Sequence, residues 1–344
     1  MIKRILFAFV LLATPLLALA DGGNNALLLT NDGTLYSVDS AFTDEMGIQS
    51  PAAQVLVLTV RNDQRSSTAI VPETLLGGSN SNPALAFDPA SNSLFIFWQR
   101  ALNNGMSSDL VFCAYSNGKW SEATSVNFAK YHYAHNIQIA VTRKIDQVDA
   151  KGDHASVNGL TVHAVWWEET GRTEWARYAI LGIDNGVLTS SQIWDLTSFS
   201  DVSRETTGPT DKDFNDEILR HPVVFESSTH DTVDIIYGDT TTNNLHRLTV
   251  KPTIKLAASE GRLRIPVGVR DTSIGAPHFL AESTSQIHGM SGDNGRLVLY
   301  ASSKTSVEYV INENGWSPSH TLPVNDKIST EGAVDLLRRM IDTN

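Results

Sequence analysis

Residues 94–98 read Leu-Phe-Ile-Phe-Trp, and this short apolar run ending in an aromatic residue decides the fold because it returns along the chain. Related runs end at Trp167, Tyr237 and Tyr300, and a weaker one ends at Tyr36. The five aromatic positions, taken in chain order, are 62, 69, 70 and 63 residues apart. A recurring interval of that length is typical of repeat architectures.

Each aromatic run belongs to a larger repeated unit. An apolar segment precedes it, opened by Asn82-Pro83 in one repeat and by His221-Pro222 in another, each 15 residues before the aromatic position. Two further apolar segments follow, and Asn-Gly pairs separate them at residues 117–118, 185–186 and 314–315. Asn-Gly between apolar segments is the strongest short-range signal for a β-hairpin. Each unit is therefore predicted to contain four antiparallel strands.

Four-stranded units in tandem predict an all-β chain, a β-propeller, over residues 21–327. Its strands are apolar on both faces, which is expected where each blade is covered on both sides by its neighbours. A pair of β-sandwich domains would show even strand spacing without this long-period repeat. The aromatic intervals predict five blades, and the region from Ala26 to Leu76, which has no clear internal register, leaves six open.

The first twenty residues have the three-part layout of a secretory signal peptide. Lys3 and Arg4 precede an apolar run, and Ala18-Leu19-Ala20 provides a small-x-small cleavage signature. We expect cleavage between Ala20 and Asp21, a secreted or periplasmic product, and no membrane insertion after cleavage.

Charge and cysteine content exclude several classes of partner. Without Lys3 and Arg4 the chain keeps 24 basic against 38 acidic residues, which disfavours binding to nucleic acid. The single cysteine, Cys113, rules out an internal disulfide and a cysteine-based metal cluster. It lies in an apolar run and is predicted to be a buried, inert thiol. We expect no cofactor, no metal and a monomeric chain.

Residues 328–344 depart from the strand pattern and predict one amphipathic helix. Ser329-Thr330 precedes Val334, Leu337 and Ile341, which recur at helical spacing. The helix is expected to cover the edge of a blade, and docking to a partner is the alternative.

Two hairpin segments resemble shortened Asp-box turns of the sialidase-like (bacterial neuraminidase repeat) propellers. They are residues 116–122, Ser-Asn-Gly-Lys-Trp-Ser-Glu, and 312–317, Asn-Glu-Asn-Gly-Trp-Ser. Both keep the Gly and the Trp of the family pattern, and both lack its central Asp at full spacing. The resemblance implies a propeller in which each turn joins the third and fourth strands and each Trp packs under the next blade. Arg264-Ile265-Pro266 matches another family motif, but it lies in the second-last repeat rather than the first and is interpreted as a chance match.

Candidate ligand-binding residues stand two positions beyond the aromatic residues. There we find Arg100, Glu169, Asp239 and Ser302, which are expected to lie on one rim of the propeller if the strands are in register. Glu168-Glu169 directly follows Trp166-Trp167, and an acid beside an aromatic ring suits sugar binding. The predicted ligand-binding set is Arg100, Trp166, Glu168, Glu169 and Asp239, and no catalytic residue is identified.

These patterns favour a secreted, non-catalytic β-propeller that binds a glycan or an extracellular protein through one rim. The alternative is a sialidase-like glycoside hydrolase or another carbohydrate-active propeller enzyme. Such an enzyme needs two carboxylates about 5–9.5 Å apart, and spacing along the chain does not identify that pair.

Overall fold

The computed structural model describes residues 25–30, 33–62, 65–101, 108–126, 133–170, 173–184, 187–200, 222–227, 231–239, 244–257, 260–263, 270–275, 287–292, 295–303, 305–325 and 328–342. The predicted signal peptide and the Arg264-Ile265-Pro266 motif lie outside these residues.

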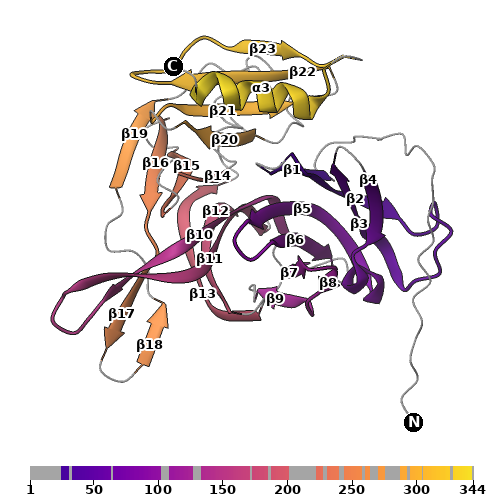
Figure 1. The fold of residues 1–344 in the computed structure, drawn as a ribbon, viewed down its shortest axis with the longest axis horizontal. Coiled ribbons are helices and arrows are strands. Elements are labelled where there is room, and N and C mark those ends of the chain that lie inside the picture. Colours follow the sequence, from indigo (N-terminus) through magenta and orange to yellow (C-terminus); the bar gives the residue numbers. More distant parts are fainter. Residues whose placement is uncertain are drawn as a thin grey trace.

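The described strands form five consecutive units, and in each unit four strands run antiparallel in chain order (Figure 1). The first unit comprises β1 (Asn25–Leu29), β2 (Leu35–Phe42), β3 (Ala52–Asn62) and β4 (Arg65–Ile70). The second comprises β5 (Gly78–Asp88), β6 (Ser93–Ala101), β7 (Ser108–Ser116) and β8 (Lys119–Trp120). The third comprises β10 (Tyr133–Val148), β11 (His154–Thr170), β12 (Thr173–Asp184) and β13 (Val187–Ser200). The fourth comprises β14 (Val223–Glu226), β15 (Val233–Asp239), β16 (Asn244–Val250) and β19 (Arg270–Gly275). The fifth comprises β20 (Ile287–Ser291), β21 (Leu297–Ser302), β22 (Ser306–Asn312) and β23 (His320–Pro323). The repeat of four-stranded units is thus confirmed, with five units in the described chain.

The first strand of each unit lies beside the first strand of the next. Contacts run from β1 to β5, then to β10, β14 and β20. The units therefore share an inner layer and spread outward from it, as the blades of a propeller do.

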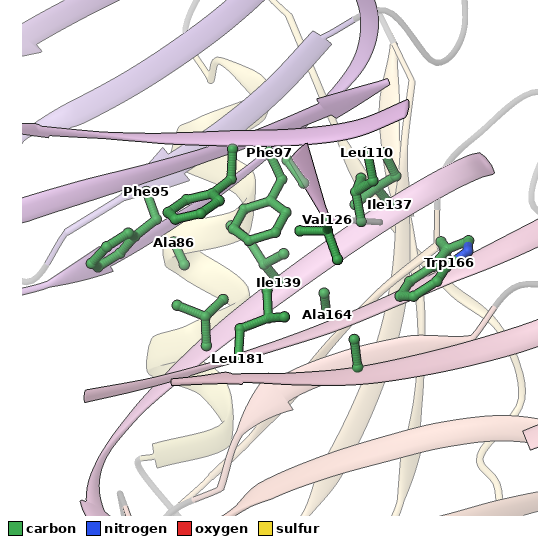
Figure 2. Packing of buried hydrophobic residues seen from close by; sticks show 14 of the residues in the cluster. Ala86, Phe95, Phe97, Leu110, Val126, Ile137, Ile139, Ala164, Trp166 and Leu181 are labelled. Carbon is green, nitrogen blue, oxygen red and sulfur yellow. The ribbon is translucent and has the colours of Figure 1, made fainter. Parts of the chain in front are cut away.

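Apolar side chains fill the space between successive units. Separate buried clusters join the first unit to the second, the second to the third, the third to the fourth and the fourth to the fifth. Figure 2 shows the second of these, in which Phe95 and Phe97 of β6 face Ile139 and Leu181 of the third unit, and Trp166 lies at the other side of the same cluster. Each fully buried side chain of this size contributes roughly 1.5–3 kcal/mol. Both faces of the inner blades are apolar for this reason, and the predicted β-propeller is confirmed.

Cys113 belongs to the cluster between the first and second units and has no exposed surface. Burial raises the pKa of its thiol. The prediction that Cys113 is buried is confirmed, and its inertness stays a prediction.

Some elements lie outside the four-strand pattern. A 3₁₀ helix, η1 (Pro72–Leu76), joins the first two units, and β9 (Thr124–Val126) pairs with β7. The hairpin of β17 (Thr253–Ala257) and β18 (Glu260–Leu263) follows β16, but it extends the sheet of the third unit. There Thr253 pairs in parallel with Asp146 of β10. The repeat pattern did not predict this insertion.

The two Asp-box-like turns have matching hydrogen bonds. Asn117 and Gly118 have φ of +52° and +75°, the conformation of a type I′ hairpin turn. The Ser121 hydroxyl accepts from the Ala114 amide at 2.9 Å, and the Ser317 hydroxyl accepts from the Ile311 amide at 3.0 Å. The hairpin prediction is therefore confirmed at residues 117–118.

The tryptophans of these turns correct one expectation. Trp120 packs in the cluster between the first and second units, and Trp316 packs in the cluster between the fourth and fifth. The Trp316 indole also donates to the Gly275 carbonyl at 3.2 Å. Each tryptophan thus faces the preceding blade rather than the next. Paired residues share a face of their sheet, and Trp120 pairs with Tyr115, which packs against the same cluster.

The C-terminal helix, α3 (Thr330–Asp342), covers the outward face of the fifth unit (Figure 1). The Ser329 hydroxyl accepts from the Gly332 amide at 3.2 Å and caps the helix. Ala333, Leu337 and Ile341 form its buried stripe, while Leu336 is exposed. The helix was predicted over the edge of a blade, and it lies instead over a face. No described helix is long and apolar enough to span a membrane.

Gly289 permits the close contact between the inner strands of the last two units. A Cβ atom there would lie 2.4 Å from the Phe225 ring, which is itself buried. We expect Gly289→Ala to lower the free energy of unfolding by about 1–3 kcal/mol, measured by denaturant titration. Gly332→Ala is the control, because its Cβ meets only ordinary contacts in a helix. That change is expected to be neutral or stabilising by up to about 1 kcal/mol, and equal losses in both variants would contradict this account.

Candidate functional site at the ends of the second strands

The rim is here the end of the blades where the second strand of each unit finishes. Arg100, Glu169, Asp239 and Ser302 all occupy the last or second-last position of β6, β11, β15 and β21. First strands begin at the same end, since Ser79 pairs with Ala101 and Tyr133 pairs with Glu169. The predicted positions therefore share one end of their strands.

The third unit is shifted by one residue from the match that the aromatic spacing predicts, in which Trp167 corresponds to Trp98. A β-bulge interrupts β5 between Ser81 and Ala84 and β10 between His135 and Gln138. Each bulge contains an asparagine in the left-handed region, with φ of +50° at Asn82 and +48° at Asn136. The bulges lie opposite Trp98 and Trp166, which makes these two tryptophans equivalent.

Packing agrees with this register. Trp98 lies in the cluster shared with the preceding first unit, and Trp166 lies in the cluster shared with the preceding second unit. Trp167 follows Trp166 directly and belongs to the opposite face. The equivalent of Arg100 is therefore Glu168 rather than Glu169, because a shift of one residue moves a side chain to the other face of its sheet.

Glu168 is a buried carboxylate whose two oxygens are both occupied. Arg177 donates to it through Nη2 at 3.1 Å and through Nε at 3.2 Å, and the Trp166 indole donates to Oε2 at 3.2 Å. Arg177 also forms an ion pair with Asp195 and lies 4.9 Å from the centre of the Trp175 ring. Trp166 itself has no exposed surface. In this conformation Glu168 and Trp166 hold the third blade together and present no surface to a ligand.

Arg100 has a different environment and stays half-buried. Its guanidinium lies 5.7 Å from the centre of the Trp98 ring. Nε donates to the Asn80 side-chain oxygen at 3.4 Å, and Nη2 donates to the Glu73 carbonyl at 3.3 Å. Of the predicted binding residues with described side chains, Arg100 keeps surface at the rim.

The junction between the third and fourth units brings three further aromatic residues to the rim. Val165 and Ile235 share one buried cluster, and Trp167 and Tyr237 stand two positions beyond them along the second strands. His246 pairs with Tyr237 across β15 and β16, with ring centres 5.4 Å apart. All three side chains are partly exposed.

Glu169 and Asp239 stand at the ends of the same two strands. The structure describes their backbones but not their side chains, so their part in binding stays a prediction. Neither Arg177 nor His246 was predicted from the sequence. Only the pairing of the third strand with the second reveals them, opposite Trp166 and Tyr237.

His163 forms a buried polar network away from the rim. Its ring nitrogens lie 3.0 Å from the Thr142 hydroxyl and 2.8 Å from the Tyr178 hydroxyl. Burial lowers the pKa of His163 to about 3, which keeps the ring neutral. This network is structural. Among the described residues, no three His, Cys, Asp or Glu side chains gather as a metal site.

No protein-family model matches the chain, and neither does any curated protein. Among solved structures, a mutant of NanB sialidase from Streptococcus pneumoniae aligns at 9% identity and a TM-score of 0.34 over 64% of this chain and 28% of the sialidase chain. A GH43 β-1,3-galactosidase with galactodeoxynojirimycin aligns at 10% identity and 0.41 over 90% and 92%, respectively. The β-propeller domain of the Trilobed protease from Pyrococcus furiosus aligns at 7% identity and 0.36 over 90% and 73%. The chain spans about a quarter of the sialidase's length.

Proposed function

We propose that this chain is an exported, non-catalytic β-propeller that binds a glycan at the rim, at the junction of its third and fourth units. The observation that supports this proposal is the partly exposed set of Trp167, Tyr237 and His246. Ligand sites combine aromatic surface with a few polar groups that fix orientation. Sugar rings suit such a surface because their C–H faces stack on aromatic rings while their hydroxyls reach polar neighbours.

Two acids are proposed to supply the polar groups. Glu169 lies two residues beyond Trp167, and Asp239 lies two residues beyond Tyr237. Ionised carboxylates accept hydrogen bonds, and sugar hydroxyls donate them. The predicted leader supports export, since such segments direct secretion. The single cysteine agrees with export, because its burial leaves no accessible thiol in an oxidising compartment.

A glycoside hydrolase is the second candidate, and the same two acids favour it. Retaining and inverting enzymes place two carboxylates about 5–9.5 Å apart around the glycosidic bond.

A hydrogen bond across the inner layer of strands favours binding at the junction rather than on the propeller axis. There the Gln138 amide of β10 donates to the Ile287 carbonyl of β20, which ties the third unit to the fifth.

A glycan array probed with the purified chain tests this function. We expect Trp167→Ala to weaken binding of the retained glycan at least tenfold, the equivalent of about 1.4 kcal/mol. Trp120→Phe is the matched control, since Trp120 is a partly buried tryptophan at the opposite end of its blade and is expected to change nothing.

Three outcomes decide between the candidates. Glycan binding that survives Trp167→Ala, or that Trp120→Phe weakens equally, contradicts the proposed junction. Turnover of the bound glycan that disappears in Glu169→Gln and Asp239→Asn identifies the hydrolase instead. Binding without turnover supports the non-catalytic propeller.

A further inference from the structure

The first and second units bring a second set of residues to the rim. Phe42 pairs with Gln54, Ala52 pairs with Gly78, and Ser79 pairs with Ala101. This chain of pairings places the end of β2, the helix η1 and the end of β6 together. Arg100 therefore lies beside the loops of the first unit, at a junction different from that of Trp167 and Tyr237.

Arg100 is held by neutral groups alone. Its partners are the Asn80 amide oxygen, the Glu73 carbonyl and the Trp98 ring. No carboxylate among the described residues forms an ion pair with it, including Asp109, its partner in register. Five other described arginines do contact a carboxylate: Arg143, Arg177, Arg247, Arg296 and Arg339. In a chain of net charge −12, this guanidinium lacks the internal counter-charge that those arginines have.

Buried groups fix the position of Arg100. Asn80 has no exposed surface, donates to the Gln54 and Thr74 carbonyls at 2.8 and 3.1 Å, and accepts from the Trp98 indole at 2.8 Å. Gly78 has a φ of +76°, and a Cβ there would lie 2.6 Å from the Ala101 carbonyl oxygen. Only glycine allows η1 to approach the end of β6 this closely. The guanidinium is thus oriented before any ligand arrives.

Large apolar side chains on the two neighbouring loops face solvent. Leu76 is 69% exposed, Phe42 is 49% exposed and Met46 is 38% exposed. The Met46 amide donates to the Phe42 carbonyl, and the Ser50 hydroxyl donates to the Leu75 carbonyl at 2.8 Å, which joins the two loops. Exposed apolar surface beside an oriented arginine is the composition of protein–protein hot spots.

We propose that this end of the first two units docks a segment of a partner protein in which an acidic side chain lies between apolar ones. The carboxylate pairs with the outward part of the Arg100 guanidinium, and the apolar neighbours cover Leu76, Phe42 and Met46. Charge complementarity selects this occupant. A guanidinium prefers a carboxylate in fork geometry, and the carboxylate supplies the counter-charge that the described chain does not.

An array of hexapeptides tests the proposal on the purified chain. Each peptide carries Asp, Glu, Asn or Gln at its third position, flanked by Leu, Phe or Met. We expect the acidic members to bind at least tenfold more tightly than their amide counterparts, with an affinity that falls as salt rises. Arg100→Met, which keeps an apolar stem over Trp98, is expected to abolish that preference. Arg61→Met is the matched control, because Arg61 is exposed on the same sheet at the opposite end of β3.

A second variant keeps the test independent of folding. Leu76→Ser changes a side chain that is mostly in solvent, so we expect an unchanged Tm and at least fivefold weaker binding of the acidic peptides. Equal binding of acid and amide peptides, or a preference that survives Arg100→Met, overturns the proposal. Arg100-dependent binding of anionic phosphatidylglycerol vesicles without peptide binding overturns it too, in favour of a lipid surface.

Discussion

Replacing Glu168 with alanine is expected to lower the free energy of unfolding by about 3–5 kcal/mol. The change removes the buried partner of Arg177, whose side chain is only 16% exposed and which then keeps only the largely exposed Asp195. It also leaves the Trp166 indole without its carboxylate acceptor. A group buried among blade contacts cannot replace these hydrogen bonds with water. Chemical denaturation, followed by tryptophan fluorescence, measures the loss.

The double variant Glu168→Leu with Arg177→Met is the control for this prediction. It removes both charges together, so we expect it to retain most of the stability that Glu168→Ala loses. Asp195, which is largely exposed, is expected to contribute less when replaced by alanine. A Glu168→Ala variant of normal stability that loses glycan binding would reverse the assignment and return Glu168 to the ligand site.

Leu337→Ala in the C-terminal helix is expected to destabilise the chain by about 2–5 kcal/mol. Leu337 has no exposed surface and packs among Val298, Val307 and Tyr309 on the outward face of the fifth blade. Shortening the side chain leaves a cavity between α3 and that face of the blade. The midpoint of denaturant unfolding reports the effect.

Leu336 provides the matched control for the helix. It precedes Leu337 directly and is 42% exposed. Leu336→Ala removes the same atoms from solvent-facing surface and is expected to change stability by no more than about 0.5 kcal/mol. Equal effects at the two positions would show that the helix does not pack through the stripe of Ala333, Leu337 and Ile341.

The repeat of four-stranded units was predictable because its strands and turns have local signals. Apolar runs and Asn-Gly turns each depend on a few neighbouring positions, and the aromatic intervals of 62–70 residues show that the unit recurs. The terminal helix was predictable for the same reason, from Ser329 and the recurrence of Leu337 and Ile341. These signals left the number of blades open. The strands between Asn25 and Ile70 form one unit, so the described chain has five blades.

The candidate site was less predictable because it depends on register. Trp166-Trp167-Glu168-Glu169 offers two tryptophans and two acids, and the sequence pattern does not say which of each pair is buried. The folded sheet decides it: the bulge at Asn136 lies opposite Trp166, and Trp166 packs into the buried cluster shared with the second unit. The pairing of β17 with β10 was unpredictable too, since it joins residues more than a hundred positions apart.

Each blade takes its four strands in chain order, and among the described strands only the β17–β18 hairpin joins the sheet of an earlier blade, which has a consequence for synthesis. A unit can complete its sheet as soon as its own residues have emerged, and the next unit then finds a finished surface to pack against. The outward face of the fifth unit is covered only when α3, the thirteen-residue helix that follows β23 along the chain, has emerged. A chain cut before residue 330 would leave that apolar face of the sheet uncovered. The arrival of α3 is therefore the step that removes this apolar surface from solvent.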